Sequence, residues 1–159
     1  MTELTYADSL LRVIEQRKQE LRALEGRLRA AQSHPGSHEW DAREVLLHLI
    51  GATQGMPDDL RGAAPGVAPR QPGGRYIERP ELASALDASA LLLEQLDAIA
   101  DAVRVLDDDA LSRRVTLSDG DGNPLPDVPI GLVVRHGLTE HFDEHLTQVR
   151  AALASGGAG

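Results

Sequence analysis

Residues 40–50 of the chain read WDAREVLLHLI and indicate the start of an amphipathic helix. Asp41 is followed three residues later by Glu44, which is close to the spacing of a capping box, and Trp40 stands where a hydrophobic staple would pack. Apolar residues then dominate up to residue 50, and glycines follow at positions 51 and 55. We therefore predict a helix that begins after Asp41 and ends near residues 51–55.

Three other segments show helical periodicity, at about residues 4–31, 80–106 and 129–153. In each of them apolar residues recur every three or four positions, and polar or charged residues fill the opposite face. The first segment holds several arginines, Arg17 among them, interleaved with glutamates, which is typical of a solvated helix face. Asp107–Asp109 follow the third segment, and because acidic residues are unfavourable at a helix C-terminus, we expect fraying there.

The connections between these helices differ in length. Residues 56–79 are rich in proline and glycine and predict a long connection between the second and third helices. Residues 110–128 predict a second irregular connection, with a short extended piece at residues 114–117. Four helices predict an all-α four-helix bundle, and the long connection leaves room for the second and third helices to run parallel.

Length, composition and charge exclude several classes of protein. The 159 residues predict a single domain over residues 1–154, followed by a flexible tail at residues 155–159. Without cysteine, no disulfide framework, thiolate metal site or cysteine nucleophile can form. The net charge is −9, whereas nucleic-acid binders typically carry a basic surface, so we do not expect nucleic-acid binding. No apolar run approaches the roughly 20 residues that span a bilayer, and no secretory signal is visible, so we expect a cytoplasmic protein without a membrane partner.

The last predicted helix carries two histidines four residues apart, His141 and His145. Both belong to a seam whose spacings alternate between four and three residues, which is typical of positions that face the interior of a bundle. Side chains four residues apart project from successive turns of one face, so two imidazoles at this spacing can share one metal ion. The predicted seam comprises Val134, Leu138, His141, His145, Gln148 and Ala152.

A third histidine, His48, lies in the apolar stripe of the helix that begins after Asp41. A single histidine on an apolar face is more often a hydrogen-bonded core residue than a metal ligand. Three imidazoles in one core are costly, because each buried polar group without a partner loses roughly 1–3 kcal/mol. A divalent ion removes that cost by accepting the lone pairs, and a three-histidine site leaves coordination positions open for water or substrate. The combination therefore favours a metal site.

The remaining histidines and one acidic residue carry weaker signals. His136 lies about 140° around the helix from His141 and is expected to point elsewhere. His34 and His38 precede the second helix in a predicted turn. His38 and Glu144 are candidates for proton transfer. Glu144 has two other interpretations, as a residue that orients an imidazole and as a surface acid.

Two further motifs match known sites in part. Residues 141–145 fit H-x-x-E-H, the motif of inverted zinc peptidases, but no acidic residue follows Glu144 to serve as the additional ligand. Residues 119–123 (DGDGN) imitate the start of a calcium loop, but Pro124 and Ile130 stand where glycine and a bidentate glutamate are needed. We therefore favour neither a peptidase nor a calcium site.

Two longer motifs lie in the second and fourth helices. Residues 40–49 (WDAREVLLHL) are similar to W-[ST]-x-x-E-x-x-x-H-L, with aspartate in place of Ser or Thr, and residues 141–148 (HFDEHLTQ) are similar to H-x-x-x-H-x-x-Q. Together they resemble the DinB/YfiT-like superfamily. The resemblance implies a four-helix bundle, commonly a homodimer, with a divalent metal ion held by His48, His141 and His145. Nickel or zinc is the metal that the resemblance favours, and iron and manganese are alternatives.

The expected function follows from this site and this resemblance. Some members of the superfamily are thiol S-transferases or isomerases that use bacillithiol, mycothiol or glutathione. We expect a metal-dependent enzyme, of transferase or hydrolase type, that activates water or a low-molecular-weight thiol to act on a small-molecule substrate. The alternative is a non-catalytic metal-binding or dimerisation bundle.

Overall fold

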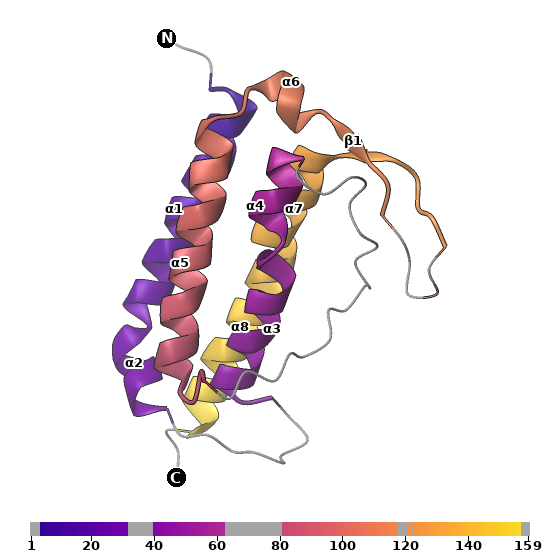
Figure 1. Ribbon diagram of the computed structural model, residues 1–159. Coiled ribbons are helices and arrows are strands. Elements are labelled where there is room, and N and C mark those ends of the chain that lie inside the picture. The colour runs from indigo at the N-terminus through magenta and orange to yellow at the C-terminus, as the bar shows by residue number, and fades with distance from the viewer. Residues whose placement is uncertain (1–3, 32–39, 63–80, 118–120, 122, 157–159) are drawn as a thin grey trace.

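The computed structural model describes residues 4–31, 40–62, 81–117, 121 and 123–156. The described chain is mostly helical, and its long helices pack side by side as a bundle (Figure 1), which confirms the predicted fold class at this level. In chain order the elements are α1 (Tyr6–Ala23), α2 (Glu25–Ala30), α3 (Ala42–Thr53), α4 (Met56–Arg61), α5 (Ala85–Arg104), α6 (Asp108–Leu111), β1 (Arg114–Val115), β2 (Val128–Pro129), α7 (Ile130–Leu138) and α8 (Glu140–Gly156).

The helices α3 and α5 run in the same direction, and α1 and α8 run in the opposite one (Figure 1). Near the start of both parallel helices, Arg43 donates a hydrogen bond to the carbonyl of Leu82. At the end of α3, the Thr53 hydroxyl donates to Oε1 of Gln95 in the middle of α5, at 2.7 Å. The second and third predicted helices are therefore parallel.

Two predicted helices are broken. The first divides at Leu24 into α1 and α2, and the fourth divides at Thr139 into α7 and α8. Thr139 has φ −109° and ψ −89°, which lies outside the α region and bends the chain between α7 and α8. The last helix extends to Gly156, so its end lies within the segment predicted as a tail.

Part of the predicted long connection is helical. The helix α4 begins after Gly55, carries Pro57 in its first turn and ends at Gly62, whose φ of 68° is left-handed. Proline is tolerated in a first turn, because the N–H groups there have no partner within the helix, and glycine adopts positive φ readily. The signals that predicted a loop from residue 56 therefore mark a short helix, and residues 63–80 lie outside the described part of the chain.

The three aspartates beyond α5 belong to the next helix, α6, and the fraying predicted at the end of α5 stays a prediction. The helix ends at Arg104, and Asp107 is instead the N-cap of α6, accepting a hydrogen bond from the Ala110 amide at 2.8 Å. Asp108 accepts from the backbone amide of Tyr6 at 3.1 Å, so its charge lies at the positive end of α1. The chain then forms β1, which pairs antiparallel with β2 and confirms part of the extended piece predicted at residues 114–117.

The core of α1 contains one charged residue that the sequence analysis placed on the solvated face. Five apolar positions of the first predicted helix are buried, and Leu11 is half-buried. Arg17 is only 4% exposed, so its assignment to the solvated face is wrong. The buried positions of α1 and α2 are Leu10, Ile14, Arg17, Leu21, Leu24 and Leu28, with the C-cap residue Leu24 included. No described helix combines the length and the apolarity needed to cross a bilayer.

Candidate metal centre

Three imidazoles from two antiparallel helices meet at one point of the bundle. Nε2 of His48, on α3, lies 3.3 Å from Nε2 of His141 on α8, and Nε2 of His145 lies 3.1 Å from the same atom. The rings of His48 and His145 have their centroids 4.3 Å apart. His48 and His145 are 5% and 8% exposed, and His141 is half-buried. The predicted convergence of the three histidines is confirmed.

The start of α3 places His48. Asp41 and Glu44 form the predicted capping box: each side chain accepts the backbone N–H of the other residue at 2.8 Å. His48 follows Glu44 by four residues and therefore lies one turn further along the helix. The ring of Trp40, immediately before the cap, lies against that of His48 with the centroids 5.3 Å apart.

Two of the three nitrogen–nitrogen distances fit the coordination shell of one ion. Each of these histidines offers a nitrogen, and the three ligand atoms all lie within 4.8 Å of one another. Ring nitrogens at about 2.0–2.1 Å from a divalent ion are roughly 2.8–3.0 Å apart when they are neighbours in an octahedral shell and roughly 3.3–3.4 Å apart in a tetrahedral one, so the two shells together span about 2.8–3.4 Å. The two measured Nε2–Nε2 distances, 3.1 and 3.3 Å, fall in this interval.

Gln148 selects the tautomer of His145. Nδ1 of His145 lies 2.8 Å from Oε1 of Gln148, and because an amide oxygen only accepts, Nδ1 carries the hydrogen. The lone pair of the neutral ring is then on Nε2, the atom that faces the other two histidines. Gln148 is exposed, so the prediction that it belongs to the core seam is wrong, and its contact with His145 supports the site.

The centre of the seam on α8 is shifted from the predicted one. Phe142, Leu146 and Val149 are each 0% exposed and pack in the bundle core, whereas the seam was predicted through His141, His145 and Gln148. Apolar side chains gain most from the driest positions, so they take the centre and leave the histidines on the flank that faces α3. This shift brings His141 and His145 to the contact between α8 and α3.

The environment of His141 disfavours the protonated form of its ring. The pKa of His141 is lowered from 6.5 to about 4, first by burial and then by the neighbouring rings of His145 and His48. Its imidazole is therefore neutral at pH 7 and has a lone pair to offer. The negative charge of Glu144 acts in the opposite direction and raises the pKa of His141, so Glu144 interacts electrostatically with the cluster.

The other predicted site residues lie apart from the cluster or outside the described chain. Glu144 is exposed, and its carboxylate does not belong to the group of three ligand atoms. His136 points elsewhere, as predicted: Nδ1 of its exposed ring lies 3.0 Å from Oε2 of Glu140. His34 and His38 lie outside the described residues, so the role predicted for His38 stays a prediction.

Comparisons with known proteins add no relative. No protein-family model, curated protein or solved structure matches the chain. The resemblance to the DinB/YfiT-like superfamily therefore rests on the sequence motifs. The three-histidine cluster is supported by the positions of its ring nitrogens.

Proposed function

We propose that His48, His141 and His145 bind one divalent metal ion through their Nε2 atoms. The observation that carries this proposal is the convergence of three imidazole nitrogens, with neighbours 3.1 and 3.3 Å apart, in a mostly buried position. Neutral imidazole is a common ligand for nickel and zinc, and also for iron. Nickel or zinc is the metal that we propose first, with iron and manganese as alternatives.

Hydrogen bonds among the three rings are a poor substitute for an ion. Nε2 of His141 makes both short contacts, to His48 and to His145. If Nε2 of His145 is an acceptor, as its contact with Gln148 indicates, Nε2 of His141 can donate to it only by using its one hydrogen. With that hydrogen used, Nε2 of His141 has neither a second hydrogen to donate to His48 nor a lone pair with which to accept from it. A cation attracts all three lone pairs at once, so it accounts for both contacts.

The proposed activity is metal-dependent catalysis of transferase or hydrolase type. A divalent ion with three histidine ligands keeps coordination positions open and lowers the pKa of a bound water or thiol, so that a nucleophile forms near neutral pH. Glu144, on the turn of α8 that carries both histidines, is the proposed proton-transfer residue on the described chain. The low-molecular-weight thiol, the small-molecule substrate, the homodimer and the cytoplasmic location stay predictions from the sequence.

Metal analysis of the purified protein tests the site. We expect about one equivalent of bound divalent metal in the wild type, and a clear loss in His48→Ala, His141→Ala and His145→Ala. His136→Ala is the matched control, because the exposed His136 ring on α7 lies against Glu140 and offers no nitrogen to the cluster. Wild-type metal content in all three cluster variants would exclude this site.

The same variants distinguish an enzyme from a non-catalytic bundle. A panel of thiol-transfer and hydrolysis substrates, assayed with metal and with chelator, should reveal turnover that chelator abolishes and that each cluster variant loses. Metal binding that raises the melting temperature, without turnover on any substrate of the panel, would favour the structural alternative.

A further inference from the structure

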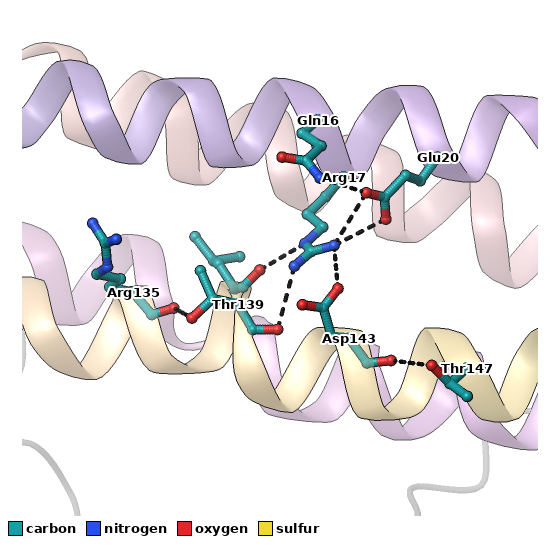
Figure 2. A network of polar contacts seen from close by, with 8 residues as sticks. Gln16, Arg17, Glu20, Arg135, Thr139, Asp143 and Thr147 are labelled. Carbon is teal, nitrogen blue, oxygen red and sulfur yellow. Dashed lines mark hydrogen bonds and ion pairs between the residues drawn. The ribbon is translucent and has the colours of Figure 1, made fainter.

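The bend between α7 and α8 contains a buried arginine from another helix. Arg17, on α1, donates from Nε to the carbonyl of Leu138 at 2.8 Å and from Nη2 to the carbonyl of Thr139 at 3.3 Å (Figure 2). Carbonyls at the end of a helix lose their partners in the next turn, and they need donors from elsewhere when they are buried. Arg17 supplies this donor to the carbonyl of Leu138, and it adds a second donor to the carbonyl of Thr139, which also accepts from the Asp143 amide at 2.8 Å. These contacts tie α1 to the bend.

The same guanidinium holds the first turn of α8. Nη1 of Arg17 lies 2.6 Å from Oδ1 of Asp143 on α8 and 2.9 Å from Oε2 of Glu20 on its own helix (Figure 2). Its central carbon also lies 5.3 Å from the centroid of the Phe142 ring. Without the cation, two carboxylates would face each other across the α1–α8 contact and repel.

Asp143 and the two histidines of α8 lie on opposite faces of that helix. Asp143 is two residues from His141 and two from His145, which corresponds to about 200° around the axis in either direction. Arg17 therefore holds α8 on the face that points away from the cluster. A rotation of α8 about its axis would carry His141 and His145 together, so their mutual distance would persist, whereas their distance to His48 on α3 would change.

We propose that Arg17 is a positioning residue of the three-histidine centre: by fixing the bend and the rotation of α8, it brings His141 and His145 within reach of His48. This inference rests on the proposed metal site. Arg17 itself supplies no ligand to the ion. Without its contacts to α8, we expect His48 to lie out of reach, so that only His141 and His145 would bind the ion.

Titration of the apo full-length protein with Co²⁺, followed by visible absorption, tests the positioning role. Arg17→Met keeps an apolar stem but loses the charge and the donors, and we expect it to lower Co²⁺ affinity about 10–100-fold and to change the absorption spectrum. Lys18→Met is the matched control, since Lys18 lies next to Arg17 but pairs with Asp97 of α5 at 2.5 Å. We expect its affinity and spectrum to equal those of the wild type.

A double-mutant cycle connects Arg17 to His48. If loss of Arg17 acts by withdrawing His48 from the ion, Arg17→Met in a His48→Ala background should cost little more than His48→Ala alone. Additive losses, or wild-type affinity in a folded Arg17→Met protein, would overturn the proposal. If the wild type itself binds no Co²⁺, the proposed metal site fails as well, so the two failures are distinguishable.

A milder variant covers the case in which Arg17→Met does not fold. The Asp143 side chain is 64% exposed, so Asp143→Asn should fold while it weakens the attachment of α8 to Arg17. Asp97→Asn is the control: it removes the same charge from the partner of Lys18, and the Asp97 side chain is 56% exposed. We expect Asp143→Asn to bind Co²⁺ more weakly than Asp97→Asn, and equal affinities would overturn the proposal.

Discussion

Nε2 of His48 lies 3.3 Å from Nε2 of His141, although 93 residues separate the two histidines in the chain. The contact joins α3 to α8 and is the point at which the third imidazole meets the i, i+4 pair. This short distance between two imidazole nitrogens is compatible with a shared cation and supports the metal site proposed above.

Gln148→Ala should lower metal affinity about 10–100-fold, because the residue that holds the hydrogen on Nδ1 of His145 is lost. Competition with a chromophoric zinc chelator measures the change. Thr147→Ala is the control, since the Thr147 hydroxyl donates only within α8, to the carbonyl of Asp143. Equal affinities of the two variants would mean that the contact between Gln148 and His145 does not support the site.

Saturating metal should raise the melting temperature of the wild type and of His136→Ala. An ion at 100 times its dissociation constant stabilises the folded state by about 2.7 kcal/mol, which corresponds to a shift of about 5–10 °C in a domain of this size. Differential scanning calorimetry with zinc and with chelator measures it. His48→Ala should show a much smaller shift, and an undiminished one would place the ion elsewhere.

The apo protein should lose stability in mild acid. His141 has a pKa of about 4 in the folded state, against 6.5 as its ordinary value, so the unfolded chain binds a proton first as the pH falls. The contribution of the neutral ring is complete above pH 6.5 and is lost between about pH 6.5 and pH 4. Urea unfolding of apo wild type and apo His141→Gln over this interval should show a smaller loss in the variant, and parallel curves would contradict the assignment.

Phe142→Ala should destabilise the fold by about 3–5 kcal/mol, because the ring is 0% exposed and its removal leaves a cavity. Chemical denaturation of the apo protein measures the difference. Gln148→Ala, at one of the positions on the predicted seam, removes an exposed side chain and its hydrogen bond to His145, and should cost about 0.5–1.5 kcal/mol. If Gln148→Ala lowered the free energy of unfolding more than Phe142→Ala, the seam predicted from the sequence would be the one that faces the core.

The histidine cluster could be predicted because it depends on local spacing. A capping box determines where α3 begins, and so the face that carries His48, and the i, i+4 spacing places His141 and His145 on one face of α8. These two local features hold even where a helix boundary or a core position elsewhere in the chain is predicted wrongly. The bundle itself followed from helical periodicity in the same way.

The rest could not be predicted because it depends on contacts between helices. Two seams, one residue apart, are compatible with the spacing on α8, and packing selected the one through Phe142. The break at Thr139 follows Gly137 by two residues, but a single glycine does not specify a bend, and the Thr139 carbonyl accepts a hydrogen bond from Arg17 of another helix. The position of Arg17 was nevertheless visible, since it fills the gap in a regular series of spacings between Ile14 and Leu21.

The most direct test of the central claim is X-ray absorption spectroscopy of the zinc-loaded protein. We predict a first shell that contains three imidazole nitrogens at about 2.0–2.1 Å, with one of them lost in each of the variants His48→Ala, His141→Ala and His145→Ala that still holds zinc. A first shell without three histidine ligands in the wild type would contradict a shared ion at the meeting point of α3 and α8.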